Sequence, residues 1–237
     1  MKQLVEPVLD GWSPVDPVSF SVWYGFEIDG LDSWSTRVSS PRGLLLNGAS
    51  EHIVAQHPLV VMRSWDESVL LDWVRLTVGS CWSTNSAEFA THLRRYFAWE
   101  YEYTLEEDRQ AMARQARASG SSLAVDPVVR YAIEVSTGDS VRAWWPDDPL
   151  RVDAWFEVGV LPHRRERALR RYRMRVVTPT ALEETEGAEI LATRPTVVLP
   201  EWSSEAVWSW VSGEVARCGA YARPDFLDLM EIAFDPR

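Results

Sequence analysis

The alternation of apolar and polar side chains from Ser19 to Ile28 predicts a β-strand with one buried face. The apolar positions recur at every second residue, at Phe20, Val22, Tyr24, Phe26 and Ile28. Trp23 lies on the opposite face, and Asp29-Gly30 follows as a turn signal. Two shorter apolar runs predict further strands, over residues 35–40 and 59–63.

Helical spacing replaces this alternation after Trp65. Apolar residues then recur three or four positions apart, at Leu70, Trp73, Val74, Thr77, Val78 and Cys81. This period predicts a helix with one face packed on the sheet. Asn85 and Glu88 are placed to cap another helix, which carries Phe89, Leu93 and Phe97. The sequence therefore predicts an α+β fold, in which an antiparallel sheet is covered on one face by helices.

The same pattern occurs twice along the chain. In and before the first strand, five residues recur 132 positions later: Trp12, Pro14, Asp16, Pro17 and Trp23 correspond to Trp144, Pro146, Asp148, Pro149 and Trp155. Farther along, Trp65, Trp73 and Cys81 recur 137 positions later as Trp202, Trp210 and Cys218. Because these blocks keep their order, we expect a tandem duplication, with one module at residues 1–103 and a diverged second copy at 127–237.

Residues 104–126, between the two copies, are expected to form a helical linker. Thr104 and Glu107 have the spacing of a capping box, in which two side chains satisfy free N–H groups at a helix start. The helix is expected to end near Ser119, because Gly120 can adopt the left-handed conformation that ends many helices. Two similar modules joined by a helix are therefore the expected architecture.

The first copy carries several motifs in a fixed order. They are Trp12-x-Pro14-x-Asp16-Pro17-x-x-Phe20, the aromatic strand to Glu27, Ser39-Ser40-Pro41, and Phe89-x3-Leu93-x3-Phe97-Ala98-Trp99-Glu100-Tyr101-Glu102. Over about 100 residues this copy resembles immunity protein 8, a family of bacterial polymorphic toxin systems. The second copy departs from the pattern, since Val152 stands at the position of Phe20 and the Trp-Glu-Tyr-Glu end is missing. The resemblance implies a non-catalytic protein that binds and neutralises a toxin, usually one encoded by an adjacent gene.

Composition and charge narrow the range of partners and locations. The chain has 24 basic and 35 acidic residues, a net charge of −11, which argues against general nucleic-acid binding because phosphates repel a negative protein. No run approaches the ~18–20 apolar residues of a transmembrane helix. The first residues lack the apolar core of a signal peptide. We therefore expect a cytoplasmic protein without a membrane partner.

Catalytic and metal-binding patterns are not found in the sequence. His52, His57, His92 and His163 show no metal-ligand spacing, and neither a phosphate-binding loop nor a nucleophile elbow occurs. We therefore expect no enzyme activity, no metal and no cofactor. Cys81 and Cys218 occupy equivalent positions in the two copies, which indicates two separate buried thiols. The Trp residues that recur between the copies are expected to lie in the cores.

Two groups of residues are candidates for binding a partner. The first is acidic and consists of Glu27, Asp29, Asp32 and Glu51 around the first hairpin and Asp66 and Glu67 at a helix start. The second consists of Trp82, Trp99 and Trp145, which have no Trp counterpart in the other copy. Trp is enriched at interface hot spots. Two interpretations of the acidic group stay open: a solvated surface with charges that favour helix N-termini, or a negative face that steers toward a basic toxin.

Residues 164–175 form the most basic segment, with seven Arg in twelve residues. In a strand, Arg171, Arg173 and Arg175 point to one side and Tyr172, Met174 and Val176 to the other. The segment is therefore either the solvated side of a hairpin or a site for an acidic partner. The alternative function is a regulatory or nucleic-acid-associated protein acting through this hairpin.

Overall fold

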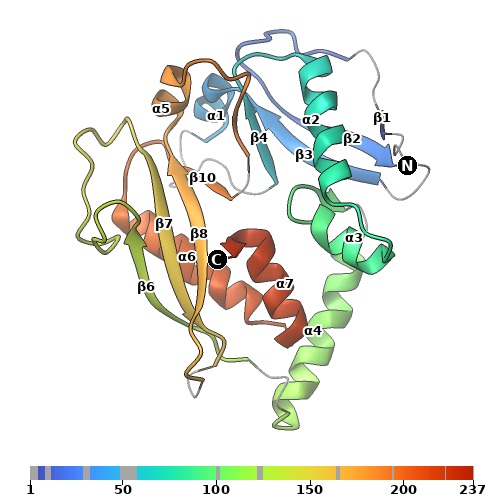
Figure 1. Ribbon diagram of the computed structural model, residues 1–237, viewed down its shortest axis with the longest axis vertical. Helices are drawn as coiled ribbons and strands as arrows, with labels where there is room; N and C mark the ends of the chain where they lie inside the picture. The colour runs from blue at the N-terminus through green and yellow to red at the C-terminus, as the bar shows by residue number, and fades with distance from the viewer. Residues whose placement is uncertain are drawn as a thin grey trace.

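The computed structural model describes residues 5–8, 12–28, 33–48, 58–99, 102–121, 125–163, 166–193, 195–221 and 223–236 (Figure 1). It contains two modules of similar construction, each with a sheet that helices cover on one face. The α+β class expected from the sequence is therefore confirmed.

The first module contains, in order, β1 (Val5–Pro7), β2 (Ser21–Ile28), β3 (Ser33–Ser39), α1 (Pro41–Gly48), β4 (Leu59–Met62), α2 (Glu67–Ser80), α3 (Ser86–Leu93) and β5 (Ala98–Trp99). Its sheet, called sheet A here, has the strand order β1-β2-β3-β4-β9, with β5 beside β3. β2 pairs antiparallel with β1 and β3, whereas β4 runs parallel to β3. A parallel pair needs a crossover connection. Helix α1 lies in this crossover and is an element that the hydrophobic pattern did not predict.

The second module follows α4 (Glu102–Ala118). It contains β6 (Val128–Glu134), β7 (Asp153–Leu161), β8 (Arg170–Val177), α5 (Pro179–Glu184), β9 (Ile190–Ala192), β10 (Thr196–Val198), α6 (Ser204–Cys218), α7 (Arg223–Ala233) and β11 (Asp235–Pro236). Its sheet, sheet B, has the order β10-β8-β7-β6, with β11 beside β8. The pairing repeats that of sheet A: β7 is antiparallel to β8, and β10 is parallel to β8.

Each module has its own core, as the periodic patterns predict. In β2 the side chains of Tyr24, Phe26 and Ile28 are buried against α2 and α3. The cap of α3 is also confirmed, because the Asn85 side chain accepts the backbone N–H of Ala87 at 3.0 Å. The two thiols are buried in different cores, at Cys81 in the first module and Cys218 in the second, and both are free.

The loop before each long strand is held by the same pair of contacts in both modules. The backbone N–H of Trp65 donates to the carbonyl oxygen of Pro17 at 2.7 Å, and that of Trp202 donates to Pro149 at 2.7 Å. An edge-on Trp packs on each of these rings, with centroids 5.4 Å apart for Trp12–Trp65 and 4.6 Å apart for Trp144–Trp202. The Trp-Pro-Asp-Pro motif therefore builds a loop and its packing.

The linker helix differs from its prediction at one end. α4 begins at Glu102, two residues before Thr104, so Thr104 lies inside the helix and is not its N-cap. The other end is confirmed, since α4 ends at Ala118 and Gly120 has φ +66°. Arg117 near this end donates to the backbone carbonyl of Gly219, which follows α6. A cation at this place is favourable, because it faces the partially negative C-terminus of α6.

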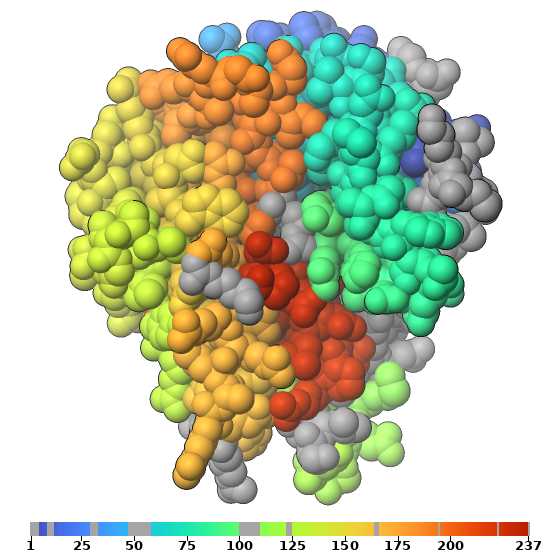
Figure 2. Space-filling model, viewed as in Figure 1, coloured from blue at the N-terminus to red at the C-terminus, as the bar shows by residue number. Residues whose placement is uncertain are grey.

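The two modules meet at a third hydrophobic cluster, called the joint here. Leu44 of α1 and Leu182 of α5 are completely buried in it, together with Leu59, Val61, Val177, Leu191, Ala192 and Val198. α1 and α5 occupy corresponding places in their modules and pack against each other. Figure 2 shows the orange residues around α5 and β9 in direct contact with the teal residues of the first module.

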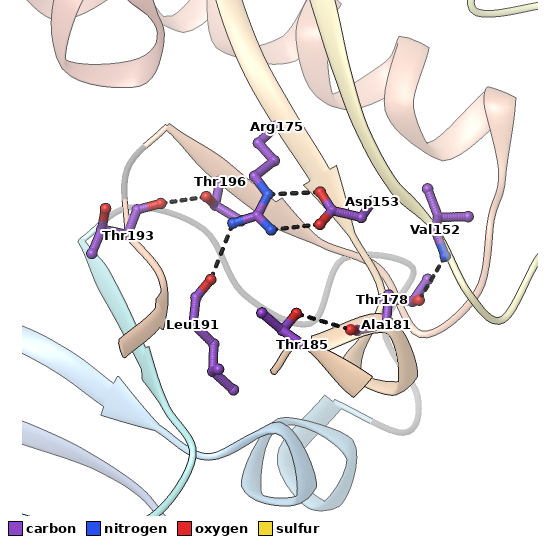
Figure 3. Close-up of polar contacts among 9 residues, drawn as sticks. All are labelled: Val152, Asp153, Arg175, Thr178, Ala181, Thr185, Leu191, Thr193 and Thr196. Carbon is purple, nitrogen blue, oxygen red and sulfur yellow. Dashed lines mark hydrogen bonds and ion pairs between the residues drawn. The ribbon is translucent and has the colours of Figure 1, made fainter. Parts of the chain in front are cut away.

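Strand β9 crosses from one module to the other. It lies in the second module by sequence, yet it pairs antiparallel with β4 at the edge of sheet A. The backbone N–H of Arg63 also donates to the carbonyl oxygen of Glu189 at 2.9 Å. Arg175 of β8 reaches this strand and donates to the carbonyl oxygen of Leu191 at 3.1 Å (Figure 3). The joint therefore consists of apolar packing, strand pairing and side-chain hydrogen bonds, which together couple the modules.

Candidate partner-binding surface

Sheet A has one side that α2 and α3 leave uncovered, and we call this side face A. It carries Glu6 and Val8 of the β1 segment, Trp23, Gly25 and Glu27 of β2, and Ser33, Ser35 and Arg37 of β3. The part of the same side that lies over β4 is covered, since Leu59 and Val61 are buried in the joint. Face A is therefore the region of this side that lies away from the joint.

Trp23 is the largest apolar group of face A, and 61% of its surface is exposed. Its strand places it opposite Arg37 of β3, and the Arg37 Nε donates to Ser21 Oγ at 3.0 Å. An exposed Trp on a paired strand is informative, because its backbone is fixed by pairing with β3 and its ring remains free to cover a partner.

Glu6 and Glu27 stand directly opposite each other on β1 and β2, and both are exposed. Like charges in directly opposed cross-strand positions destabilise a sheet. Between them and Trp23 lies Gly25, where the Val8 side chain lies 3.5 Å from the position a Cβ would occupy. Face A thus combines an aromatic ring, an apolar group and two adjacent carboxylates.

The other predicted acidic residues lie elsewhere. Asp66 is the N-cap of α2, where its carboxylate accepts the backbone N–H groups of Ser68 at 2.9 Å and Val69 at 3.2 Å. The hydroxyl of Ser68 donates to the same oxygen at 2.7 Å. These bonds stabilise the ionised form, with the Ser68 hydroxyl as the largest contribution, and lower the pKa of Asp66. Asp66 therefore stabilises a helix start.

Glu67 lies on the helix-covered side of sheet A. The hydroxyl of Tyr24 donates to Glu67 Oε1 at 3.4 Å, and Tyr24 belongs to the buried side of β2. Glu27 belongs to the opposite side of the same strand, so the structure does not bring Glu27 and Glu67 together. Asp29, Asp32 and Glu51 lie outside the described residues.

Two of the Trp candidates, Trp82 and Trp99, have different environments. Trp82 follows α2, is 53% exposed and packs edge-on against Phe89 with ring centroids 5.5 Å apart. Trp99 is half-buried and stacks on Trp34, and the guanidinium carbon of Arg94 lies 5.0 Å from its ring centroid. Trp82 therefore presents a ring to solvent, whereas Trp99 is largely committed to packing within the module.

The corresponding side of sheet B, called face B here, has the same arrangement with other residues. Trp155 stands opposite Arg175, Glu157 opposite Arg173, and Gly159 opposite Arg171. Arg175 is fixed by a bidentate contact to Asp153, at 2.7 and 2.6 Å (Figure 3). The outward direction predicted for these arginines is confirmed, because Tyr172, Met174 and Val176 between them are buried.

The expectation that the recurring Trp residues lie in the cores is wrong for Trp12, which is 41% exposed, and for both members of one further pair. Trp23 and Trp155 are 61% and 39% exposed, because both stand on the uncovered side of their sheets. The available signal was the alternation itself, which places Trp23 on the side opposite to the apolar residues of its strand. Glu6 gave no such signal, since the short strand β1 has too few residues to show a period.

Metal-binding clusters and membrane spans are not found in the described part of the chain. Within these ranges, no group of three or more His, Cys, Asp and Glu side chains is placed to hold a metal ion. No helix among the described residues is long and apolar enough to cross a bilayer. Burial raises the pKa of the Cys218 thiol to about 12, so this thiol is protonated at neutral pH.

Face A presents an exposed Trp, a residue type enriched at protein-binding hot spots, on a paired strand with two carboxylates at its outer end. The fold and this surface define a two-module α+β protein with a candidate protein-binding face. Residues 3–103 match the model of the family immunity protein 8, so this part of the chain is similar to that family. The matched residues contain all of face A. Comparisons with curated proteins and with solved structures found no match.

Proposed function

We propose that this chain is an immunity protein that binds a cognate bacterial toxin domain and neutralises it by non-covalent occlusion. The observation that carries the proposal is the position of face A: Trp23, Glu6 and Glu27 form an exposed patch inside the segment that matches the immunity family. The proposed toxin is encoded by an adjacent gene, and the complex forms in the cytoplasm. Occlusion requires no catalytic group and no cofactor.

In the proposed mechanism, the charges of face A speed association with the toxin, and the aromatic ring stabilises the bound complex. Glu6 and Glu27 attract a basic toxin surface, and such complementarity mainly raises the association rate and selects the partner. Trp23 then covers a desolvated pocket of the toxin, where a single aromatic anchor carries much of the binding energy. Because β2 is paired on both sides, little order has to be gained on binding. Lasting protection requires nanomolar or tighter affinity, about −12 kcal/mol.

We further propose that the chain arose by duplication and divides into residues 1–103, 104–126 and 127–237. The matching loop contacts of Trp65 and Trp202 and the corresponding places of α1 and α5 support this division. The second module then acts as a scaffold that covers one side of β4 and supplies β9 to sheet A.

The alternative function, nucleic-acid binding through residues 164–175, has weaker support. Arg175 is engaged by Asp153, and Glu166 of the same segment pairs with Arg223 at 2.6 Å. Carboxylates interleaved with the arginines repel phosphates. Deleting residues 164–171 discriminates between the functions, because it should leave toxin neutralisation intact and abolish any nucleic-acid binding.

The test is co-expression with the product of the adjacent gene. The wild-type chain should restore growth to cells that express the toxin and should co-purify with it in a stoichiometric complex. Trp23→Ala should weaken both effects, with slower growth of the toxin-expressing cells and less co-purified toxin, whereas the matched control Trp82→Ala, which removes an exposed Trp on the helical side, should leave them unchanged. A harmless gene product that does not bind the chain would contradict the proposal.

A further inference from the structure

Face A and face B are built on the same scaffold but carry opposite local charge. In both, a Trp stands opposite an Arg: Trp23 with Arg37, and Trp155 with Arg175. Two rows farther out, face A has Glu27, with Glu6 beside it, and face B has Arg171 opposite Gly159. The Trp–Arg row is common to the two faces, and the outermost row lies the same number of residues from it on both. That outermost row carries opposite charges on the two faces.

Two side chains fill the outer part of face B and leave Arg171 as its exposed charge. The ring of Tyr131 lies over Gly159, so close that an added Cβ would meet it at 2.4 Å. The Tyr131 hydroxyl donates to Glu157 at 2.7 Å, which holds this carboxylate in a buried position. Arg171 is exposed and has no ion-pair partner among the described residues. The outer end of face B therefore presents a positive charge two rows away from the exposed ring of Trp155.

The two faces of one molecule point away from each other. In Figure 1, α2 lies in front of sheet A, whereas β7 and β8 lie in front of α6, so the uncovered sides of the two sheets lie on opposite sides of the protein. A contact between an acidic face A and a basic face B can then form only between two molecules. Such a contact joins different surfaces and does not close on itself in a pair.

We propose that face B binds face A of a second copy of this chain, which gives a head-to-tail association. Trp155 and Trp23 supply the apolar centre of the contact, and Arg171 lies against Glu27 and Glu6 of the neighbouring copy. The net charge of −11 makes any two copies repel each other at long range, so face B is the place where this repulsion is locally reversed. The association is consequently weak and concentration-dependent. The association does not require a toxin, and a toxin bound to face A would compete with it.

Sedimentation velocity of the full chain over a range of concentrations tests this proposal. The average mass should rise above that of one chain with increasing concentration. Glu27→Lys and Arg171→Glu should each hold the protein at the mass of one chain, and the two changes combined in one chain should restore association, because the faces have exchanged charge. The Asp72→Lys variant has the same charge change at an exposed position of α2, and it should associate like the wild type.

Three outcomes would overturn the proposal. The first is a wild-type chain that stays at the mass of one chain at millimolar concentration. The second is association that Glu27→Lys abolishes but the combined exchange does not restore, which indicates contacts between like faces. The third is a wild-type chain that stays single while a short DNA duplex binds it and Arg171→Glu abolishes that binding, which would assign face B to nucleic acid. Circular dichroism of each variant checks that the fold is intact.

Discussion

The uncovered faces of the two sheets show how one scaffold supports two different surfaces. Both place an exposed Trp beside an Arg, but the rows beyond it carry Gly25 and Glu27 on sheet A, and Glu157 and Gly159 on sheet B. On sheet B, Tyr131 and Glu157 fill the surface with their own hydrogen bond, whereas sheet A leaves its carboxylates exposed. The buried positions of the two modules therefore support the same fold, whereas the residues on the uncovered faces differ in charge and size.

The largest effect is expected at the joint, where the two modules share a core. Leu182→Ala should destabilise the protein by about 3 kcal/mol, because it leaves a cavity in a completely buried cluster. If the modules are one cooperative unit, thermal unfolding of the variant should still show a single transition, shifted to lower temperature. Two separate transitions, with that of the first module unchanged, would show that the modules are independent. Calorimetry measures both.

The faces should differ strongly in toxin affinity. Trp23→Ala should weaken binding of the toxin domain by about 2 kcal/mol, about 30-fold in Kd, because it removes the aromatic anchor. Trp155→Ala should change Kd by less than about twofold, since face B lies outside the proposed interface. Isothermal titration calorimetry of both variants measures this difference. Equal losses would contradict the assignment of binding to face A alone.

Substituting Ala for a glycine should change the stability of the protein differently at Gly159 of face B and at Gly25 of face A. Gly159→Ala should cost about 1–2 kcal/mol, because the Cβ would meet the Tyr131 ring at 2.4 Å and displace its bond to Glu157. Gly25→Ala should stay within about 0.5 kcal/mol of the wild type, because the new Cβ makes an ordinary contact with Val8 at 3.5 Å. Denaturant unfolding of the two variants tests this contrast, and a larger loss at Gly25 would refute the packing described for face A.

The smallest effect concerns the caps of two corresponding helices. Asp66 caps α2, and Ser203 caps α6. The pKa of Asp66 is lowered from its usual value of 3.8 in the folded protein, so its contribution to stability is present above this pH and is lost as the pH falls through the folded-state value. The stability advantage of the wild type over Asp66→Ser should therefore shrink between pH 7 and pH 3. An advantage that grows toward low pH would contradict this account.

The sequence predicts the local elements well and the assembly poorly. The period of β2, the helix after Trp65 and the Asn85 cap follow from local spacing, and each is confirmed. The crossover helix α1 spans only eight residues, with Gly43 and three consecutive Leu residues of which two are exposed, so the spacing of its apolar residues did not reveal it. The addition of β9 to sheet A depends on the joint, which forms from residues more than 100 positions apart, and local periodicity contains no information about such contacts.

The candidate site was predicted in part. Glu27 was singled out from its charge, and the structure places it on face A beside Glu6. Asp66 could not be distinguished from a binding residue by sequence, since a capping carboxylate and a binding carboxylate have the same local pattern at a helix start. Trp23 was assigned to the core because it recurs, although its place in the alternation puts it on the uncovered side.

Hydrogen exchange of the chain, free and in complex with the toxin domain from the adjacent gene, tests whether the toxin binds face A. The account predicts that toxin binding slows exchange in β1 and at the edges of β2 and β3, and leaves β7 and β8 unchanged. Slower exchange confined to β7 and β8, or to α2 and the residues around Trp82, would contradict the assignment of the toxin-binding surface to face A.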